Sequence, residues 1–309
     1  MYQVKAKLQL KPIVFCKLLQ NLYFFYHYTD KIYNIQQIQI KDDNLITKDK
    51  INSYIEKIPP SSKVLQVTLS LLNEGELSKA AQVAQKDLAL SAYLHDLVNK
   101  PIYGFKTQVS DIGQIFGILG VSRSQQTVYN YMIHLLSPSK WVLFKLNKAS
   151  FSNLQADLAV NWQRCLLHLD IQDKEVESAI SLLPASIIVA EALFHEKIED
   201  VQLLRSVNPI DLNSILGRLC NMDLFDICEQ IAIKWEMDKK IPTIIQAASG
   251  MKPTEDAALN SLGKWMHLLL FYTLSQPLYI EAGLNDFIDF QIDYVADIYP
   301  EFSEVMGIS

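Results

Sequence analysis

The sequence predicts an all-α protein, and three observations support this fold class. Apolar residues recur at helical spacing, as in Val64, Leu65, Leu69 and Leu72. Glycine and proline interrupt the pattern at short intervals, which ends one helix and begins the next. No segment after residue 47 shows the strict alternation of a half-buried strand. Many short helices with short connections indicate a compact helical globule rather than a long bundle.

The helices can be placed in order along the chain from these signals. A first helix over 48–58 runs into Pro59 and Pro60, and Ser61-Ser62 can cap a second helix that Gly75 ends. We expect Gly120 to separate two further helices. From Leu77 onward the expected helices cover residues 77–84, 88–97, 109–119, 121–136, 150–169, 173–195, 197–206, 208–219, 221–236, 238–249 and 255–275.

Composition excludes several classes of protein. Half of the 309 residues are hydrophobic and the net charge is −6, so the chain can bury a large core and does not resemble a basic nucleic-acid binder. The most apolar N-terminal stretch, 12–28, is broken by polar residues and falls short of a membrane span. Cys16, Cys165, Cys220 and Cys228 form no C-x-x-C pair, which excludes a zinc ribbon and fits a reducing cytoplasm. We therefore expect a cytoplasmic protein with no nucleic-acid or membrane partner.

The first 46 residues differ from the rest of the chain. Residues 1–50 hold eight lysines and four aspartates, a net charge of +4, so the remaining residues carry −10. The pattern is irregular, although residues 33–40 could form a short strand. This extension is either a small N-terminal appendage or the result of a start site assigned too far upstream, and both readings stay open.

Residues 58–131 resemble the N-terminal half of the HDOD family, the HD-related output domains of bacterial signalling proteins. The resemblance rests on an entry at Pro59-Pro60, a helix start at Asp87 with Leu90, an Asn-x-x-x-Tyr-Gly turn, and a Leu-Gly helix end. In the third and fourth motifs the matching residues are Asn99, Tyr103, Gly104 and Gly120. Their chemistry suits capping, tight turns and packing, so we interpret them as structural.

The second half resembles the part of HDOD proteins that descends from metal-dependent HD phosphohydrolases. That ancestry implies a His, a His-Asp pair and a distal Asp that bind a metal, which activates water. Here the His-Asp pair reads Pro184-Ala185, and two later family histidines read Ala248 and Ser249. The upstream family histidine falls near Ala156. The resemblance therefore implies a degenerate site with no metal or other cofactor.

One His-Asp pair, His95-Asp96, lies on the wrong helix for the family site. With His134 it could form a non-standard metal site, but two ligands without the rest of a coordination set are a weak motif. We interpret it as a solvated pair beside the Asn99 turn. Neither a P-loop nor a G-x-G-x-x-G sequence occurs.

The C-terminal segment is strongly acidic, with nine acidic residues and one lysine from Thr254 to Ser309. Asp286, Asp289, Asp293 and Asp297 would share one face of a helix. The plain interpretation is a solvated helix face, and the functional alternative is a docking surface for a basic partner.

These observations predict three parts: an extension over 1–46, an HDOD-like domain of two helical halves over 47–250, and an acidic helical segment over 251–309 that packs on it. We expect a non-catalytic regulatory module that binds another signalling protein, or senses a small ligand in a cleft between its halves. Two alternatives stay open: a phosphohydrolase with non-standard ligands, and a non-catalytic binder of cyclic dinucleotides.

Overall fold

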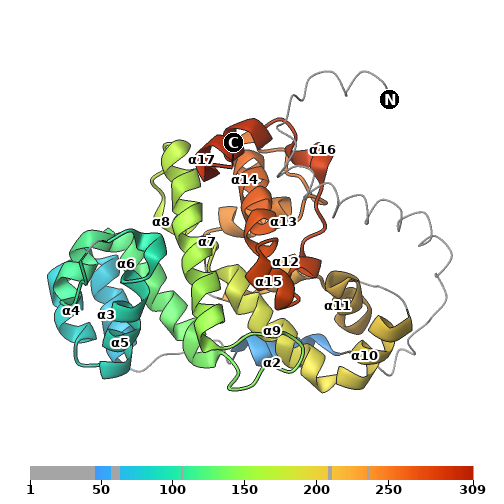
Figure 1. Ribbon diagram of the computed structural model, residues 1–309, viewed down its shortest axis with the longest axis horizontal. Coiled ribbons are helices and arrows are strands. Elements are labelled where there is room, and N and C mark those ends of the chain that lie inside the picture. Colours follow the sequence, from blue (N-terminus) through green and yellow to red (C-terminus); the bar gives the residue numbers. More distant parts are fainter. Residues whose placement is uncertain (1–45, 57–62, 106, 208–210, 235–236, 309) are drawn as a thin grey trace.

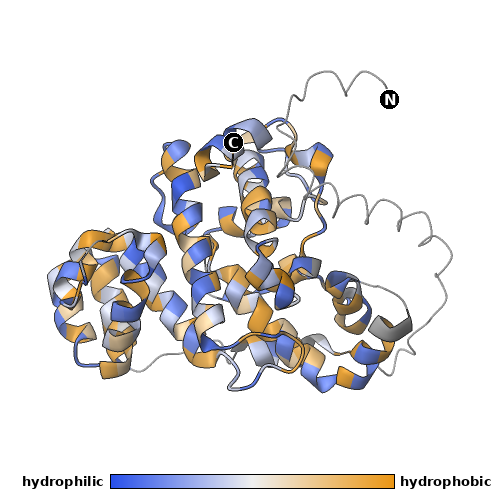
Figure 2. Ribbon diagram, viewed as in Figure 1, coloured by the Kyte–Doolittle hydropathy of each residue, from blue (hydrophilic) through white to orange (hydrophobic). Residues whose placement is uncertain are grey.

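The computed structural model describes residues 46–56, 63–105, 107–207, 211–234 and 237–308, and every regular element among them is a helix (Figure 1). The predicted all-α class is therefore confirmed. Apolar and polar residues alternate around the helices, as amphipathic packing requires (Figure 2). The short strand expected over 33–40 lies outside the described residues.

A small lobe is built from the first helices after residue 62 (Figure 1). Its elements are α3 (Lys63–Asn73), α4 (Leu77–Ala84), α5 (Leu88–Val98), the 3₁₀ turn η4 (Pro101–Tyr103) and the first half of α6 (Ile112–Leu136). They enclose a core of their own, which includes Leu72, Leu94 and Phe116.

A larger lobe holds the remaining helices and a second core, to which Trp162, Phe194 and Phe302 belong. Because Phe302 lies near the end of the chain, the acidic C-terminal segment packs into the same core as the helices before it. The elements are α2 (Lys48–Glu56), α7 (Lys148–His168), α8 (Lys174–Ala179), α9 (Leu182–Glu196), α10 (Ile198–Val207), α11 (Leu212–Cys220), α12 (Leu224–Lys234), α13 (Lys240–Ala248), α14 (Ala257–Leu274), α15 (Pro277–Glu281), η5 (Asn285–Phe287), α16 (Ile292–Val295) and α17 (Tyr299–Met306).

Aspartate side chains start many of these helices. In each case a carboxylate oxygen accepts hydrogen bonds from N–H groups of the first turn, which would otherwise lack partners. The capping residues of this kind are Asp87, Asp111, Asp173, Asp211 and Asp256. These caps fix where five of the helices begin.

One predicted helix break is confirmed, and one predicted helix is divided in the structure. Gly120 separates the two helices expected around it, because its backbone is non-helical, with a left-handed φ of 72°, and kinks the element labelled α6 at this point. The single helix expected over 173–195 is divided into α8 and α9 by a turn at Ile180 and Ser181.

The helix expected over 286–297 is wrong. The segment contains η5, an extended stretch and the four-residue α16. Phe287 and Ile288 are consecutive and both buried, and the backbone there is extended at Ile288. The Asn213 side chain donates to the Phe287 carbonyl at 2.6 Å, and the Gln291 N–H donates to His267. These tertiary contacts override the helical pattern, so the four aspartates do not share one face.

Helix α9 lies at the centre of the larger core. The run 174–196 is apolar and long enough to span a membrane by length and composition, but 83% of its most apolar window is buried in the protein. That burial identifies a core helix.

One buried carboxylate on α9 holds the connection between α6 and α7. Glu191 is 2% exposed. It accepts hydrogen bonds from three successive backbone N–H groups, those of Val142, Leu143 and Phe144, with the contacts to Leu143 at 3.2 and 3.3 Å. An ionised group satisfied by several backbone donors is among the strongest hydrogen-bonded arrangements in a protein.

Glu191→Gln should therefore lower the free energy of unfolding by about 2–3 kcal/mol, because an amide cannot accept from all three donors. Urea unfolding followed by circular dichroism measures this loss. The exposed Glu304 provides the control, and Glu304→Gln should change stability by no more than about 0.5 kcal/mol. Equal stability of the two variants would contradict this role of Glu191.

Candidate functional site

The residues of the first-half signature shape the small lobe. The Asp87 carboxylate accepts from the Ala89 and Leu90 N–H groups, each at 3.0 Å. Leu90 is fully buried. Both ends of the Asn99 amide bond to the backbone of Val109, at 2.9 and 2.8 Å, which closes the loop between α5 and α6.

The turn that follows uses Tyr103 and Gly104. Burial raises the pKa of Tyr103 to about 12, so this phenol stays neutral. Gly104 ends η4 with a left-handed φ of 70°. Pro59 and Pro60 lie outside the described residues.

The positions that the family resemblance assigns to metal ligands are occupied by closely packed residues. Pro184 and Ala185 lie in the first turn of α9, and both are buried. Ala248 ends α13 without exposed surface, and Ser249 is 5% exposed. Ala185 and Ala248 belong to the large core, whereas Ala156 packs in the small one.

The polar atoms next to these positions are engaged in internal hydrogen bonds. Ser186 donates to the Leu183 carbonyl at 2.8 Å and accepts from the Cys228 thiol at 3.2 Å. Burial raises the pKa of Cys228 to about 12, so it remains a thiol rather than a metal-binding thiolate. Ser249 donates to the Gln246 carbonyl at 2.6 Å. The residues present do not fit the metal that the family ancestry implies.

A histidine that sequence analysis left without a role lies beside these positions. His267, on α14, is fully buried. Its Nε2 accepts from the Gln291 N–H at 3.1 Å, so Nδ1 carries the proton and donates to the Ala248 carbonyl at 2.8 Å. Both nitrogens are used, and the imidazole ties the end of α13 to the C-terminal segment. Only the assembled fold reveals this role.

The alternative metal residues do not assemble either. His134 stacks near Tyr93, with ring centroids 5.3 Å apart, and burial followed by the charges of Lys148 and Lys100 lowers its pKa. Asp96 is exposed. Across the described residues, no group of three or more His, Cys, Asp or Glu is arranged to hold a metal ion. His95 therefore belongs to no such group.

Three of the four C-terminal aspartates are exposed, and the four do not lie on one helix. Asp289, Asp293 and Asp297 are exposed. Lys264 binds both oxygens of Asp297 at 2.8 and 2.7 Å. Asp286 lies in η5, apart from the short α16 that carries Asp293.

The two lobes are joined by direct hydrogen bonds. The Gln126 side chain on α6 donates to the Glu177 carbonyl at 2.7 Å. Gln155 on α7 donates to the Asn130 carbonyl at 2.8 Å. Lys100 reaches Ser152 and Asn153 on α7 at 2.9 and 2.8 Å. These contacts pack the two lobes against each other along α6 and α7, and a ligand cleft between the halves stays a prediction.

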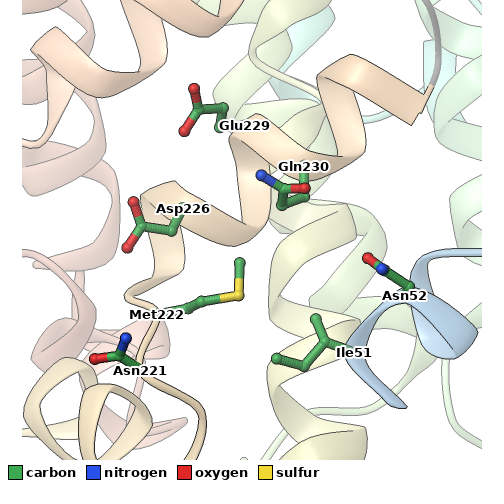
Figure 3. A pocket seen from close by; sticks show the side chains of 7 residues that line it. All are labelled: Ile51, Asn52, Asn221, Met222, Asp226, Glu229 and Gln230. Carbon is green, nitrogen blue, oxygen red and sulfur yellow. The ribbon is translucent and has the colours of Figure 1, made fainter. Parts of the chain in front are cut away.

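A cleft of about 260 Å³ opens elsewhere, within the larger lobe, between α2 and the turn from α11 to α12 (Figure 3). It combines an apolar floor with amide and carboxylate groups. Its lining residues are Ile51, Asn52, Asn221, Met222, Asp226, Glu229 and Gln230. Sequence analysis singled out none of them, because α2 and α12 are more than 160 positions apart. The spacing of Asp226 and Glu229 on one helical face was the only available signal.

Comparison with known proteins relates this architecture to one family. The family model of the HDOD domain matches residues 58–250. An HDOD domain protein with unknown function from Geobacter sulfurreducens superposes with a TM-score of 0.53 at 15% identity, over 84% of this chain and 97% of that one. A protein from Shewanella amazonensis SB2B, named "Putative phosphohydrolase", gives a TM-score of 0.51 at 14% identity, over 82% and 96%. At these identities the likeness concerns the fold alone. No curated protein matches the sequence.

The hydrogen bonds of His267 predict a pH-dependent stability. Burial lowers its pKa in the folded protein, against the opposing effect of the Ala248 hydrogen bond. The neutral form therefore contributes stability above the unfolded value of about 6.5, and this contribution falls as the pH drops below it. His267→Gln should cost about 1–3 kcal/mol at pH 8, because one of the two bonds is lost.

Urea unfolding at pH 8 and pH 5 measures both effects. The loss of stability between the two pH values should be smaller in His267→Gln than in the wild type. The exposed His195 provides the control, and His195→Gln should keep the wild-type dependence. An unchanged pH dependence in His267→Gln would show that other groups set it.

Proposed function

The chain belongs to the HDOD family, and from this premise we propose that it is a non-catalytic regulatory module that acts by binding another molecule. One observation carries the proposal: the positions where HD enzymes hold their metal are Pro184, Ala185, Ala248 and Ser249, all buried in packed structure. Proline and alanine have no ligand atoms in their side chains. Without a metal, HD-type activation of water has no agent.

The conservative form of the proposal is a protein that presents its surface to another signalling protein in the cytoplasm. The net charge of −6 favours a protein or small-molecule partner over nucleic acid. Asp289 and Asp293 are exposed and offer negative charge to a basic partner surface. We propose neither a membrane partner nor a cofactor.

The first test is metal binding and hydrolysis by the full chain. The protein is incubated with manganese, iron and zinc, and loose ions are removed by gel filtration before elemental analysis. We expect far less than one equivalent of each metal, and no metal-stimulated hydrolysis of bis(p-nitrophenyl) phosphate above the buffer rate. Stoichiometric metal with turnover would overturn the proposal.

The same assay examines the non-standard site of His95, Asp96 and His134. If activity appears, the His95→Ala variant decides its origin. Loss of activity with an unchanged circular dichroism spectrum would assign catalysis to that site. The matched control is the exposed His195, because His195→Ala removes an imidazole far from Asp96 in sequence.

A second test returns the family pair to α9. Ala185 has no exposed surface, so Ala185→Asp places a carboxylate in an apolar core and should cost several kcal/mol of stability. Pro184→His combined with Ala185→Asp should bind no manganese, because Ala248 and Ser249 still supply no ligands of the family set. Urea unfolding and elemental analysis read the two effects separately. A double variant that folds and gains metal would show that the rest of the site had survived.

A further inference from the structure

The cleft between α2 and α12 has three chemically distinct parts (Figure 3). Ile51 and Met222 give it an apolar side. The side chains of Asn52, Asn221 and Gln230 each bring an amide, with one acceptor oxygen and one NH2 donor group, to this side. Asp226 and Glu229, one turn apart on α12, provide the charged wall. A ligand that fits needs a short apolar stem and a head rich in hydrogen-bond donors.

Asp226 is already committed to partners inside the protein. It shares a reciprocal cap with Asp223 at the start of α12, with bonds of 3.0 and 2.8 Å. It also accepts from Lys252 at 2.9 Å and from Gln246 at 3.2 Å. Burial alone would raise the pKa of Asp226, but these hydrogen bonds outweigh it and lower the pKa. The Lys252 contact shows that this wall binds an ammonium group.

Glu229 retains capacity for a further donor. Gln246 donates to its Oε2 at 2.6 Å, and Oε1 makes no contact in the described part of the chain. The side-chain amide oxygen of Gln246, Oε1, is buried and has no donor in the described part of the chain. Acceptors thus outnumber donors around α12, where three carboxylates face one lysine.

We propose that this cleft binds an alkylammonium group, with the ammonium on Glu229 and the amide oxygens and the alkyl stem against Ile51 and Met222. The group belongs either to a free primary amine or to a lysine side chain of a partner. This inference rests on the proposed binding function and names the ligand chemistry of that function. Because its test reads occupancy of one cleft, its failure would leave protein binding elsewhere on the surface intact.

The test is a titration of the full chain labelled with ¹³C at its methionine methyl groups. Met222→Leu assigns the Met222 signal, because leucine conserves the volume. We expect butylammonium chloride at pH 7 to shift this signal saturably, whereas butanol, its neutral counterpart, does not at the same concentration and ionic strength. Absence of saturation, or an equal shift with butanol, would overturn the proposal.

Two charge variants locate the binding. Glu229→Gln should weaken butylammonium about fivefold, as expected for a partly exposed ion pair. Glu304→Gln makes the same charge change on α17 and should leave the affinity unchanged. Equal affinities of the wild type and Glu229→Gln for butylammonium would contradict the assignment. It would also be contradicted if magnesium chloride displaced butylammonium as effectively as a second alkylammonium salt does.

The source of the ammonium is decided by acetyl-lysine-amide, in which only the side-chain amine is free. Binding at least as tight as that of butylammonium would indicate a partner's lysine. Binding of butylammonium alone would indicate a free amine. Both results support the shared chemistry, and failure of both ligands would remove it.

Discussion

The structure depends on the burial of one helix from every side. In α9, residues from Leu182 to Phe194 are almost all buried, so the helix has no solvated face. A helix of this kind folds only when others surround it, and most of its stability comes from that packing. Helices α2, α7, α10 and α12 all contact it, although α2 and α12 lie more than 160 positions apart in sequence. The one carboxylate it buries, Glu191, is used to hold the loop before α7.

This constraint also determines what occurs at the former metal positions. A His-Asp pair buried without its metal would leave charged and polar groups unsatisfied, at a cost of several kcal/mol. Pro184 and Ala185 avoid that cost and add apolar contacts. On the other side of the site, His267 uses both ring nitrogens to join α13 to the C-terminal segment. The same region that would coordinate an ion in an enzyme serves here as packing between helices.

The sequence predicts most of the fold, because the residues that start and end its helices act locally. Aspartate caps such as Asp87 and Asp256, together with Gly75 and Gly104, place helix ends within a few residues of their observed positions. It fails where distant contacts decide the backbone. The segment over 286–297 has a helical pattern. However, the burial of Phe287 and the hydrogen bond from the Gln291 N–H to His267 keep it from forming one continuous helix.

The same reasoning explains which parts of the site were accessible from sequence. The absence of the family's metal-binding residue types at the matching positions is a matter of residue identity, so the sequence alone indicates it. The cleft is not, because α2 and α12 lie far apart in sequence and meet only in the tertiary fold.

In the proposed role, this fold uses its carboxylates to bind a ligand directly, without a metal between them. In a metal site, carboxylates are neutralised by the ion they hold. Here Asp226 is neutralised by Lys252, and its neighbour Glu229 keeps one oxygen for a further donor. The carboxylates lie at the edge of a cleft of about 260 Å³, where water screens them and binding is reversible. Weak, charge-directed binding is the chemistry a regulatory module needs, since its ligand has to leave as readily as it arrives.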